Sequence, residues 1–169
     1  MEVHELLIDL FDRVAEHVQE AVDGLGADAL ITPPEPGANP IGWLVWHLTR
    51  VQDHHISEIL ERDQEWIEGK WAGRFGVAPD PRNTGYGHSW KEVMSVRPEN
   101  AGVLVAYYSA VAARTRQLLD STTAADLDRV VDERWDPPVT LGVRLISVAD
   151  DDIQHGAQAV YVRGILDRR

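Results

Sequence analysis

The clearest helical pattern in the sequence lies in TLGVRLISVADDDIQHGAQAVYVRGIL, which covers residues 140–166. Its apolar residues recur every three or four positions, and this spacing predicts one long helix with a buried stripe. Thr140 is a typical N-cap, because its hydroxyl can accept a backbone N–H of the first turn. The stripe consists of Leu141, Leu145, Val148, Asp152, His155, Ala159, Val162 and Leu166. Two of these eight side chains are ionisable, so the helix should bury polar groups together with apolar ones.

The same periodicity predicts three further helices, over residues 2–24, 40–61 and 99–120. The proline-rich segment 32–40 separates the first two, because each proline lacks the N–H that a helix would use. Asn39 is the expected N-cap of the second helix, with Pro40 as its first residue. Periodicity fails over residues 62–98, which are rich in glycine, proline and aromatic residues. We expect a long crossover loop there, between the second and third helices, and loops of that length are often functional.

The four predicted helices are joined by connectors, and no strand pattern of comparable strength competes with them. This combination predicts an all-α fold, an antiparallel-type four-helix bundle. A length of 169 residues is that of one ordinary domain, so we expect a single domain over residues 1–169. The hydrophobic fraction of 44% is sufficient for a packed core.

Charge and composition exclude several classes of function. The chain has 16 Lys and Arg against 28 Asp and Glu, a net charge of −12, which repels nucleic acid and anionic membrane surfaces. It has no cysteine, which excludes disulfides, thiolate zinc sites, iron–sulfur clusters and a cysteine nucleophile. The N-terminus lacks the pattern of a signal peptide, and no apolar run approaches the length of a membrane span. We therefore expect a cytoplasmic protein.

The buried stripe of residues 140–166 places carboxylates beside a histidine. Asp151 lies four residues before His155 and Asp152 three residues before it, and both spacings bring helical side chains together. His47 lies near the buried edge of the second helix and supplies a further imidazole. With one of the two aspartates, the histidines would form a two-His, one-carboxylate metal site with open coordination. Spacing alone does not choose between Asp151 and Asp152, and a hydrogen-bonded Asp–His pair without metal is the alternative.

The other histidines lie in no comparable group, and we expect them to be solvated or hydrogen-bonded; they are His4, His17, His54, His55 and His88. Common catalytic signatures are absent, including His-Glu-x-x-His, Gly-x-Ser-x-Gly and the glycine-rich phosphate loops. A di-iron centre would need Glu-x-x-His on two helices, whereas here only Asp152-x-x-His155 approaches that pattern.

Two segments carry a resemblance to a known family. GWLVWHLTRV at residues 42–51, and DDIQHGAQ at residues 151–158 followed by YVRG, resemble the DinB-like superfamily. More narrowly they are similar to its mycothiol-dependent branch, the mycothiol S-transferases and maleylpyruvate isomerases. The resemblance implies a divalent metal, zinc or nickel, held by His47, Asp151 and His155. It also implies that Asp152 orients one of the ligating imidazoles.

The resemblance implies a function, a metal-dependent thiol S-transferase. The metal would bind the sulfur of a low-molecular-weight thiol of the mycothiol type and present the thiolate to a small electrophile. Arg50 would face the pocket mouth and pair with the anionic thiol or substrate, unless it forms a surface ion pair with Asp53. Trp43 would line an apolar substrate cavity, together with Trp46, Tyr86 and Trp90, unless core packing accounts for Trp43 and Trp46.

A rival interpretation is a non-catalytic bundle that binds a metal or a small ligand, or that acts in a stress response. A homodimer is compatible with the helix faces, although no exposed stripe demands one. The sequence does not identify the metal, the thiol or the electrophile.

Overall fold

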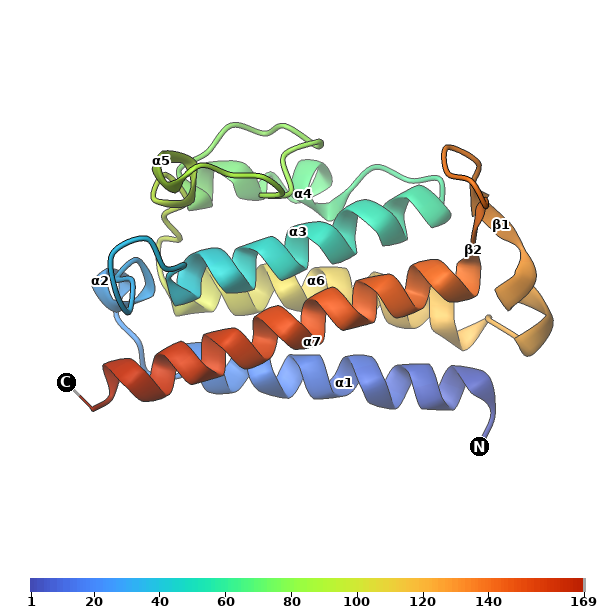
Figure 1. The fold of residues 1–169 in the computed structure, drawn as a ribbon, viewed down its shortest axis with the longest axis horizontal. Coiled ribbons are helices and arrows are strands. Elements are labelled where there is room, and N and C mark those ends of the chain that lie inside the picture. Colours follow the sequence, from blue (N-terminus) through green and yellow to red (C-terminus); the bar gives the residue numbers. More distant parts are fainter. Residues whose placement is uncertain (169) are drawn as a thin grey trace.

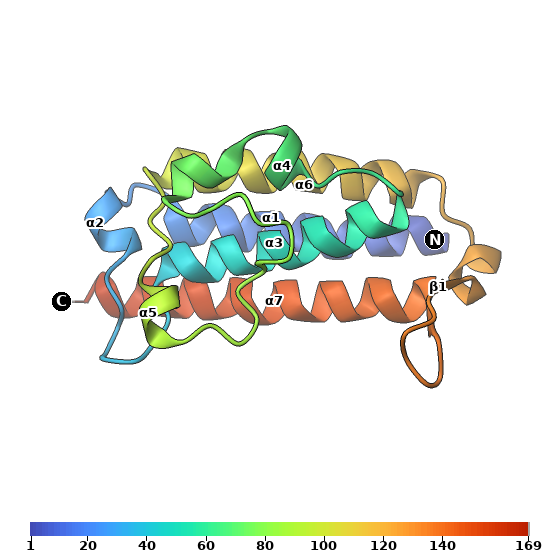
Figure 2. The same cartoon turned by 90° about the horizontal axis from the view of Figure 1, so that it is seen from above.

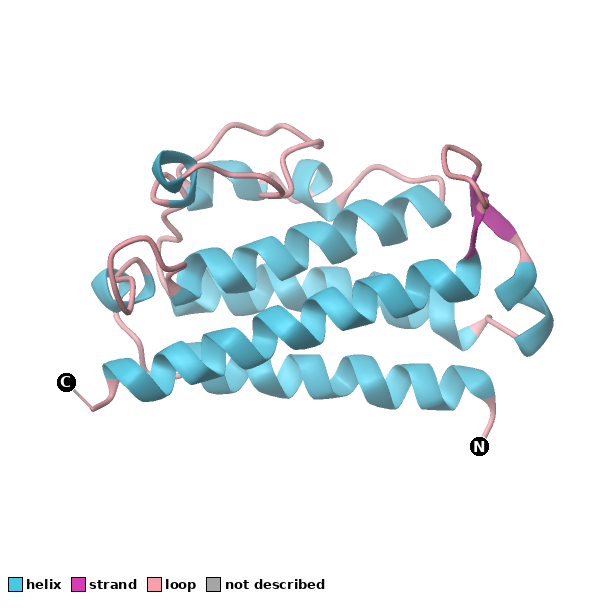
Figure 3. Ribbon diagram, viewed as in Figure 1, coloured by secondary structure: helices cyan, strands magenta, loops and turns pink. Residues whose placement is uncertain are grey.

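The computed structural model describes residues 1–168, and the chain is mostly helical, as the sequence predicts (Figure 1, Figure 3). The last residue of the predicted domain, 169, lies outside the described residues. Four long helices account for most of the chain: α1 (Val3–Val22), α3 (Ile41–Ile59), α6 (Ala101–Asp120) and α7 (Leu141–Leu166). Each lies within one of the four predicted segments. None of the helices described is long and apolar enough to cross a membrane.

The helix starts follow the capping chemistry of the sequence. The Thr140 hydroxyl caps α7 by accepting the backbone N–H of Val143, as expected. Asn100 caps α6 in the same way, through the backbone N–H of Val103 at 3.0 Å. At α3 the N-cap is Pro40, one residue later than the expected Asn39.

Several short elements connect the long helices: α2 (Ala27–Leu30), α4 (Glu65–Glu68), the 3₁₀ helices η1 (Trp71–Phe75) and η2 (Ala124–Asp128), α5 (Trp90–Val93), β1 (Val130–Asp132) and β2 (Val139–Thr140). The two strands pair antiparallel, with Val130 opposite Thr140 and Asp132 opposite Val139. They form a small hairpin just before α7 (Figure 1).

The main packing among the long helices is between neighbours: α3 packs against both α6 and α7, and α1 packs against the same two helices. Neighbours α3 and α7 run in opposite directions, as do α1 and α6 (Figure 1, Figure 2). However, α3 and α6 run in the same direction, which differs from the expected antiparallel arrangement. The reason is that the chain between them returns along the length of the molecule, so α6 begins at the end where α3 began.

This connection, residues 60–100, is called the crossover segment below. It contains α4, η1 and α5, and it runs back over α3 and α6 (Figure 2). Trp66 and Phe75 from this segment are buried in the core, with ring centroids 5.6 Å apart. Trp66 also packs 5.4 Å from Tyr107 of α6 and 6.1 Å from Trp46 of α3. The crossover segment is therefore held to the helices by aromatic packing, and residues 62–98 are not a loop without structure.

Asp132 connects the hairpin to α7 and is the basis of a pH-dependent prediction. It is buried, and its carboxylate accepts hydrogen bonds from Arg134 Nε and Arg144 Nη2, both at 2.7 Å. The hydrogen bonds from Arg134 are the largest cause that holds the pKa of Asp132 below its usual value.

We expect Asp132→Asn to lower the free energy of unfolding at pH 7, because the charge-assisted hydrogen bonds are weakened. An aspartate with a lowered pKa stabilises the fold above the usual pKa of the group and loses that contribution as pH falls through the lowered value. Urea denaturation from pH 7 down to about pH 2 should therefore show the difference from wild type shrinking. Asp12→Asn, at an exposed ion pair with Arg116, is the control and should change little. A difference that is constant with pH would contradict the prediction.

Candidate metal centre

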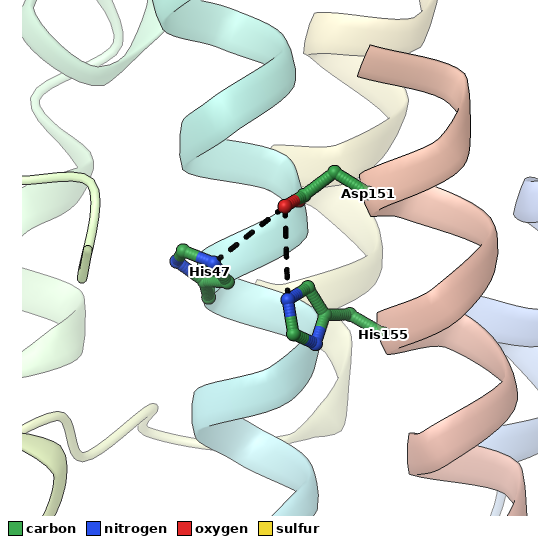
Figure 4. Close-up of side chains that lie close together, drawn as sticks. All are labelled: His47, Asp151 and His155. Carbon is green, nitrogen blue, oxygen red and sulfur yellow. Dashed lines mark ion pairs between the residues drawn. The ribbon is translucent and has the colours of Figure 1, made fainter. Parts of the chain in front are cut away.

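Three side chains from two helices meet where α3 packs against α7. His47 comes from α3, and Asp151 and His155 lie one turn apart on α7 (Figure 4). Asp151 Oδ1 lies 4.0 Å from His47 Nε2 and 3.7 Å from His155 Nε2. One ligand atom from each residue lies within 4.8 Å of the other two. Ligand atoms around a tetrahedral zinc ion are about 3.4 Å apart, so small side-chain movements would allow all three to bind one ion.

The surroundings of His47 leave its Nε2 atom free to bind a metal. The residue is only 5% exposed, and its ring stacks on Trp43 with centroids 4.7 Å apart. Its Nδ1 lies 2.5 Å from the main-chain carbonyl oxygen of Thr84, so the Nδ1 proton is donated there. Nε2 is then unprotonated and faces Asp151. Burial lowers the pKa of His47 to about 4, which keeps the imidazole neutral at pH 7, the form that binds metals.

His155 is arranged in the same way. Its Nδ1 lies 2.8 Å from Gln158 Oε1, three residues further along α7, so the Nδ1 proton is donated to that oxygen. Its Nε2 is therefore unprotonated as well and faces Asp151. An outer hydrogen bond at one ring nitrogen is the usual way in which a ligating histidine is oriented.

Asp151 directs Oδ1 towards the two imidazoles, and its second carboxylate oxygen is left without a hydrogen bond within residues 1–168. Its Oδ2 atom is buried and accepts no hydrogen bond from the residues that the structure describes. Burial is the main cause that raises the pKa of Asp151, while His155 lowers it. Asp151 is half-buried, and a carboxylate with a buried, unpartnered oxygen is costly without a positive partner. Two free imidazole nitrogens beside this carboxylate fit a divalent cation, and three protein ligands leave a coordination position open.

Asp152 does not have the expected role. It is fully buried, and neither of its carboxylate oxygens has a hydrogen-bond partner in the described part of the chain. Burial raises its pKa well above the usual value. The imidazoles are oriented instead by Thr84 and Gln158. Of the two candidate aspartates, the structure brings Asp151 to the histidines.

We predict that Asp152→Ala raises the free energy of unfolding of the metal-free protein by about 1–3 kcal/mol, because a buried unsatisfied carboxyl is removed. Urea denaturation would measure the change. The matched control is Asp150→Ala, at an exposed aspartate on the same helix, which should shift the value by no more than about 0.5 kcal/mol. Destabilisation by Asp152→Ala would show that the carboxyl has a stabilising partner in solution.

The structure places Arg50 in the interior and not at the pocket mouth. The residue is fully buried. Its guanidinium donates hydrogen bonds to Asp53, to the hydroxyl of Tyr107 and to two main-chain carbonyls of the crossover segment. The expected position at the pocket mouth is therefore wrong, and these partners occupy the side chain that was expected to pair with thiol or substrate. The ion pair with Asp53 is present, but it is buried and does not lie on the surface.

Trp43 also contacts protein groups. It is 6% exposed, stacks on His47, and donates its Nε1 proton to His88 Nδ1 at 3.2 Å. His88 in turn donates from Nε2 to Asn83 Oδ1 at 2.8 Å. Packing therefore accounts for Trp43. The sequence predicted that His88 is solvated or hydrogen-bonded, but it offered no sign that this residue would support Trp43 beside the candidate metal centre.

A cavity of about 740 Å³ opens beside His47 and Asp151, a size typical of small-molecule sites. Its wall includes the polar side chains of His54, His88, Asn83, Thr84 and Ser147. Tyr86 is the one aromatic residue of the expected apolar lining that contributes to it. The cavity is thus more polar than the sequence suggested.

A second group with metal-ligand chemistry lies further along α3. Ligand atoms of His54, His55 and Glu58 are within 4.8 Å of one another. However, Gln64 Nε2 lies 3.1 Å from His54 Nδ1, and Arg134 donates to Glu58 at 2.8 Å. The pKa of His55 is lowered to about 3, first by burial and then by nearby arginines, whose field also opposes a cation. This group is therefore a poorer metal site than the first.

Comparisons with known proteins agree with this helical arrangement. A family model described as the DinB superfamily matches residues 10–159. The crystal structure of a conserved protein from Enterococcus faecalis is similar along the whole chain. The two sequences are 32% identical, the TM-score is 0.90, and the match covers 100% of this chain and 99% of that one. A search among curated proteins found no match.

Proposed function

This chain belongs to the DinB superfamily, and we propose that it is a metal-dependent thiol S-transferase with that family's four-helix bundle and long crossover. In this proposal His47, Asp151 and His155 hold a divalent metal, zinc or nickel. The co-substrate is a low-molecular-weight thiol of the mycothiol type, and the acceptor is a small electrophile. The observation that carries the proposal is the pair of imidazoles whose Nε2 atoms face one carboxylate.

The metal, when bound, would lower the pKa of the thiol sulfur and keep it in the reactive thiolate form. The residues of the chain prepare the site for this chemistry. Thr84 and Gln158 hold the Nδ1 protons of the two histidines, so that both Nε2 atoms are free. Burial keeps His47 neutral at physiological pH, which avoids the cost of removing a proton before the metal binds.

The cavity supports a polar co-substrate. The side chains of His88, Asn83 and Ser147 at its wall offer hydrogen-bond donors and acceptors beside the metal ligands. The chain has no cysteine, which is compatible with a reacting sulfur supplied by a separate molecule. The polar wall favours a small polar thiol as the co-substrate.

Thiol-dependent conjugation tests the proposal. Protein loaded with zinc or nickel is mixed with monobromobimane and with mycothiol, glutathione or cysteine in turn. We expect conjugation above the uncatalysed rate with at least one thiol, and loss of that rate after chelation and in His155→Ala. Stoichiometric metal binding without any rate enhancement would instead favour the rival, a non-catalytic metal-binding bundle.

A further inference from the structure

We propose that Arg50 is a positioning residue for the metal centre. It holds the crossover segment in a position where the carbonyl of Thr84 accepts a hydrogen bond from Nδ1 of His47. In this way a buried residue that does not touch the metal determines which nitrogen of His47 is free to bind it. The inference rests on the proposed metal centre and identifies what keeps one of its ligands in the binding form.

Arg50 is fixed by four partners, two of which are carbonyls of the crossover segment. Its Nε donates to the carbonyl of Asn83 at 3.1 Å, and its Nη2 donates to the carbonyl of Pro81 at 3.0 Å. Its Nη1 donates to the hydroxyl of Tyr107 at 3.1 Å and lies 3.4 Å from Asp53 Oδ2. A fully buried guanidinium is costly unless its donors are satisfied, so these contacts strongly favour one position of residues 81–83.

The same short stretch of the crossover segment contacts His47. The carbonyl of Asn83 accepts from Arg50, and the carbonyl of the next residue, Thr84, accepts from His47. The two side chains lie three residues apart on α3, on neighbouring positions of one helix face. Two successive carbonyls are therefore held by one turn of the helix. We expect loss of the first contact to weaken the second.

Gly85 shows how closely the crossover segment lies against the imidazole. Its φ angle is +93°, in the left-handed region that favours glycine. A Cβ atom at this position would lie 2.8 Å from His47 Nδ1 and 2.8 Å from a ring carbon of Trp46. Any side chain here would push the segment away from His47. Gly85 thus allows, from the loop side, the contact that Arg50 holds from the helix side.

The Thr84 carbonyl matters because neutral histidine exists as two tautomers. A carbonyl can only accept, so its contact with Nδ1 places the proton there and leaves Nε2 unprotonated. Without this contact, part of the His47 population would carry its proton on Nε2, the atom that faces Asp151. That population cannot bind the metal before the proton moves. Arg50 acts on metal binding through this equilibrium.

The test compares Arg50→Lys and Gly85→Ala with wild type in two measurements. The first is zinc affinity, by competition with a chromogenic chelator. The second is the tautomer of His47 in the metal-free protein, from ¹⁵N chemical shifts. Lysine keeps the charge but cannot bridge two carbonyls with a planar fork. We expect about a 10- to 100-fold loss of zinc affinity in both variants, together with a higher share of the Nε2–H tautomer.

Arg114→Lys is the matched control. Arg114 is also buried and also holds the crossover segment, but through the carbonyl of Asp63 and the carboxylates of Glu65 and Glu68. These residues lie well before Thr84 in the sequence. The control variant should lose stability while its zinc affinity and His47 tautomer stay as in wild type.

The outcomes separate this inference from the proposed function. Wild-type affinity and tautomer in both Arg50→Lys and Gly85→Ala would overturn the inference and leave the metal centre standing. No zinc binding by wild type would remove the metal centre, and the tautomer shift would then be the measurement that supports or overturns the role of Arg50. If Arg50→Lys does not fold, Gly85→Ala decides. Unchanged zinc affinity in that variant would show that the hydrogen bond between His47 and the Thr84 carbonyl is not needed.

Discussion

Replacing His155 by alanine should reduce bound zinc or nickel from about one equivalent per chain to a trace. The variant keeps only His47 and Asp151 as ligands. Zinc sites in proteins use three or four protein ligands, so two are expected to bind the metal weakly. His47→Ala should have the same effect, because it removes the imidazole that faces Asp151 from α3. Elemental analysis of untagged protein, purified and then reconstituted with each metal, measures the stoichiometry.

His54→Ala is the control for both variants. His54 lies on the same helix as His47 and lines the same cavity, but it belongs to the second, poorer group. It should keep the wild-type metal content. Full metal content in His47→Ala would show that the ligands are wrongly assigned, and loss of metal in His54→Ala alone would transfer the site to the second group.

Asp53→Ala should lower the free energy of unfolding by about 3–5 kcal/mol, because it leaves the guanidinium of Arg50 buried without its counter-charge. Asp53 is almost fully buried and is the centre of a hydrogen-bond network. It accepts hydrogen bonds from the hydroxyls of Ser57 and Tyr107 and from the backbone N–H groups of Glu65 and Trp66. These contacts attach the start of α4 to α3 and α6. A loss of this size is a large part of the stability of an ordinary domain.

Urea denaturation of the metal-free protein measures this effect without the contribution of bound metal. The control is Asp9→Ala, at an exposed ion pair with Arg13 on α1, which should change stability by no more than about 0.5 kcal/mol. Similar small losses in both variants would mean that the buried network contributes little net stability.

The positions of the long helices could be predicted from the sequence because helix formation depends on local periodicity and capping. The pattern over residues 140–166 and the hydroxyl of Thr140 predict a helix that the structure places at Leu141–Leu166. Asn100 was not predicted as a cap, although an asparagine just before a periodic segment is a known signal. The parallel course of α3 and α6 was missed, since it depends on the path of the crossover segment and not on either helix.

The candidate site could be predicted only in part. Helical spacing brought Asp151 and Asp152 equally close to His155, and the family resemblance favoured Asp151. The structure brings Asp151 towards His47 and leaves Asp152 buried without a partner. Gln158 could have been found, because it lies three residues after His155 on the same face.

Local sequence determined which residues are helical and which helix faces carry the candidate metal ligands. The tertiary structure decided the direction of the Arg50 side chain and the hydrogen bond between His47 and the Thr84 carbonyl. Every residue has a main-chain carbonyl, so a carbonyl that acts on a ligand leaves no mark in the sequence. Its position follows from the burial of Trp66 and the partners of Arg50, which are brought together only when α3, α6 and the crossover segment pack.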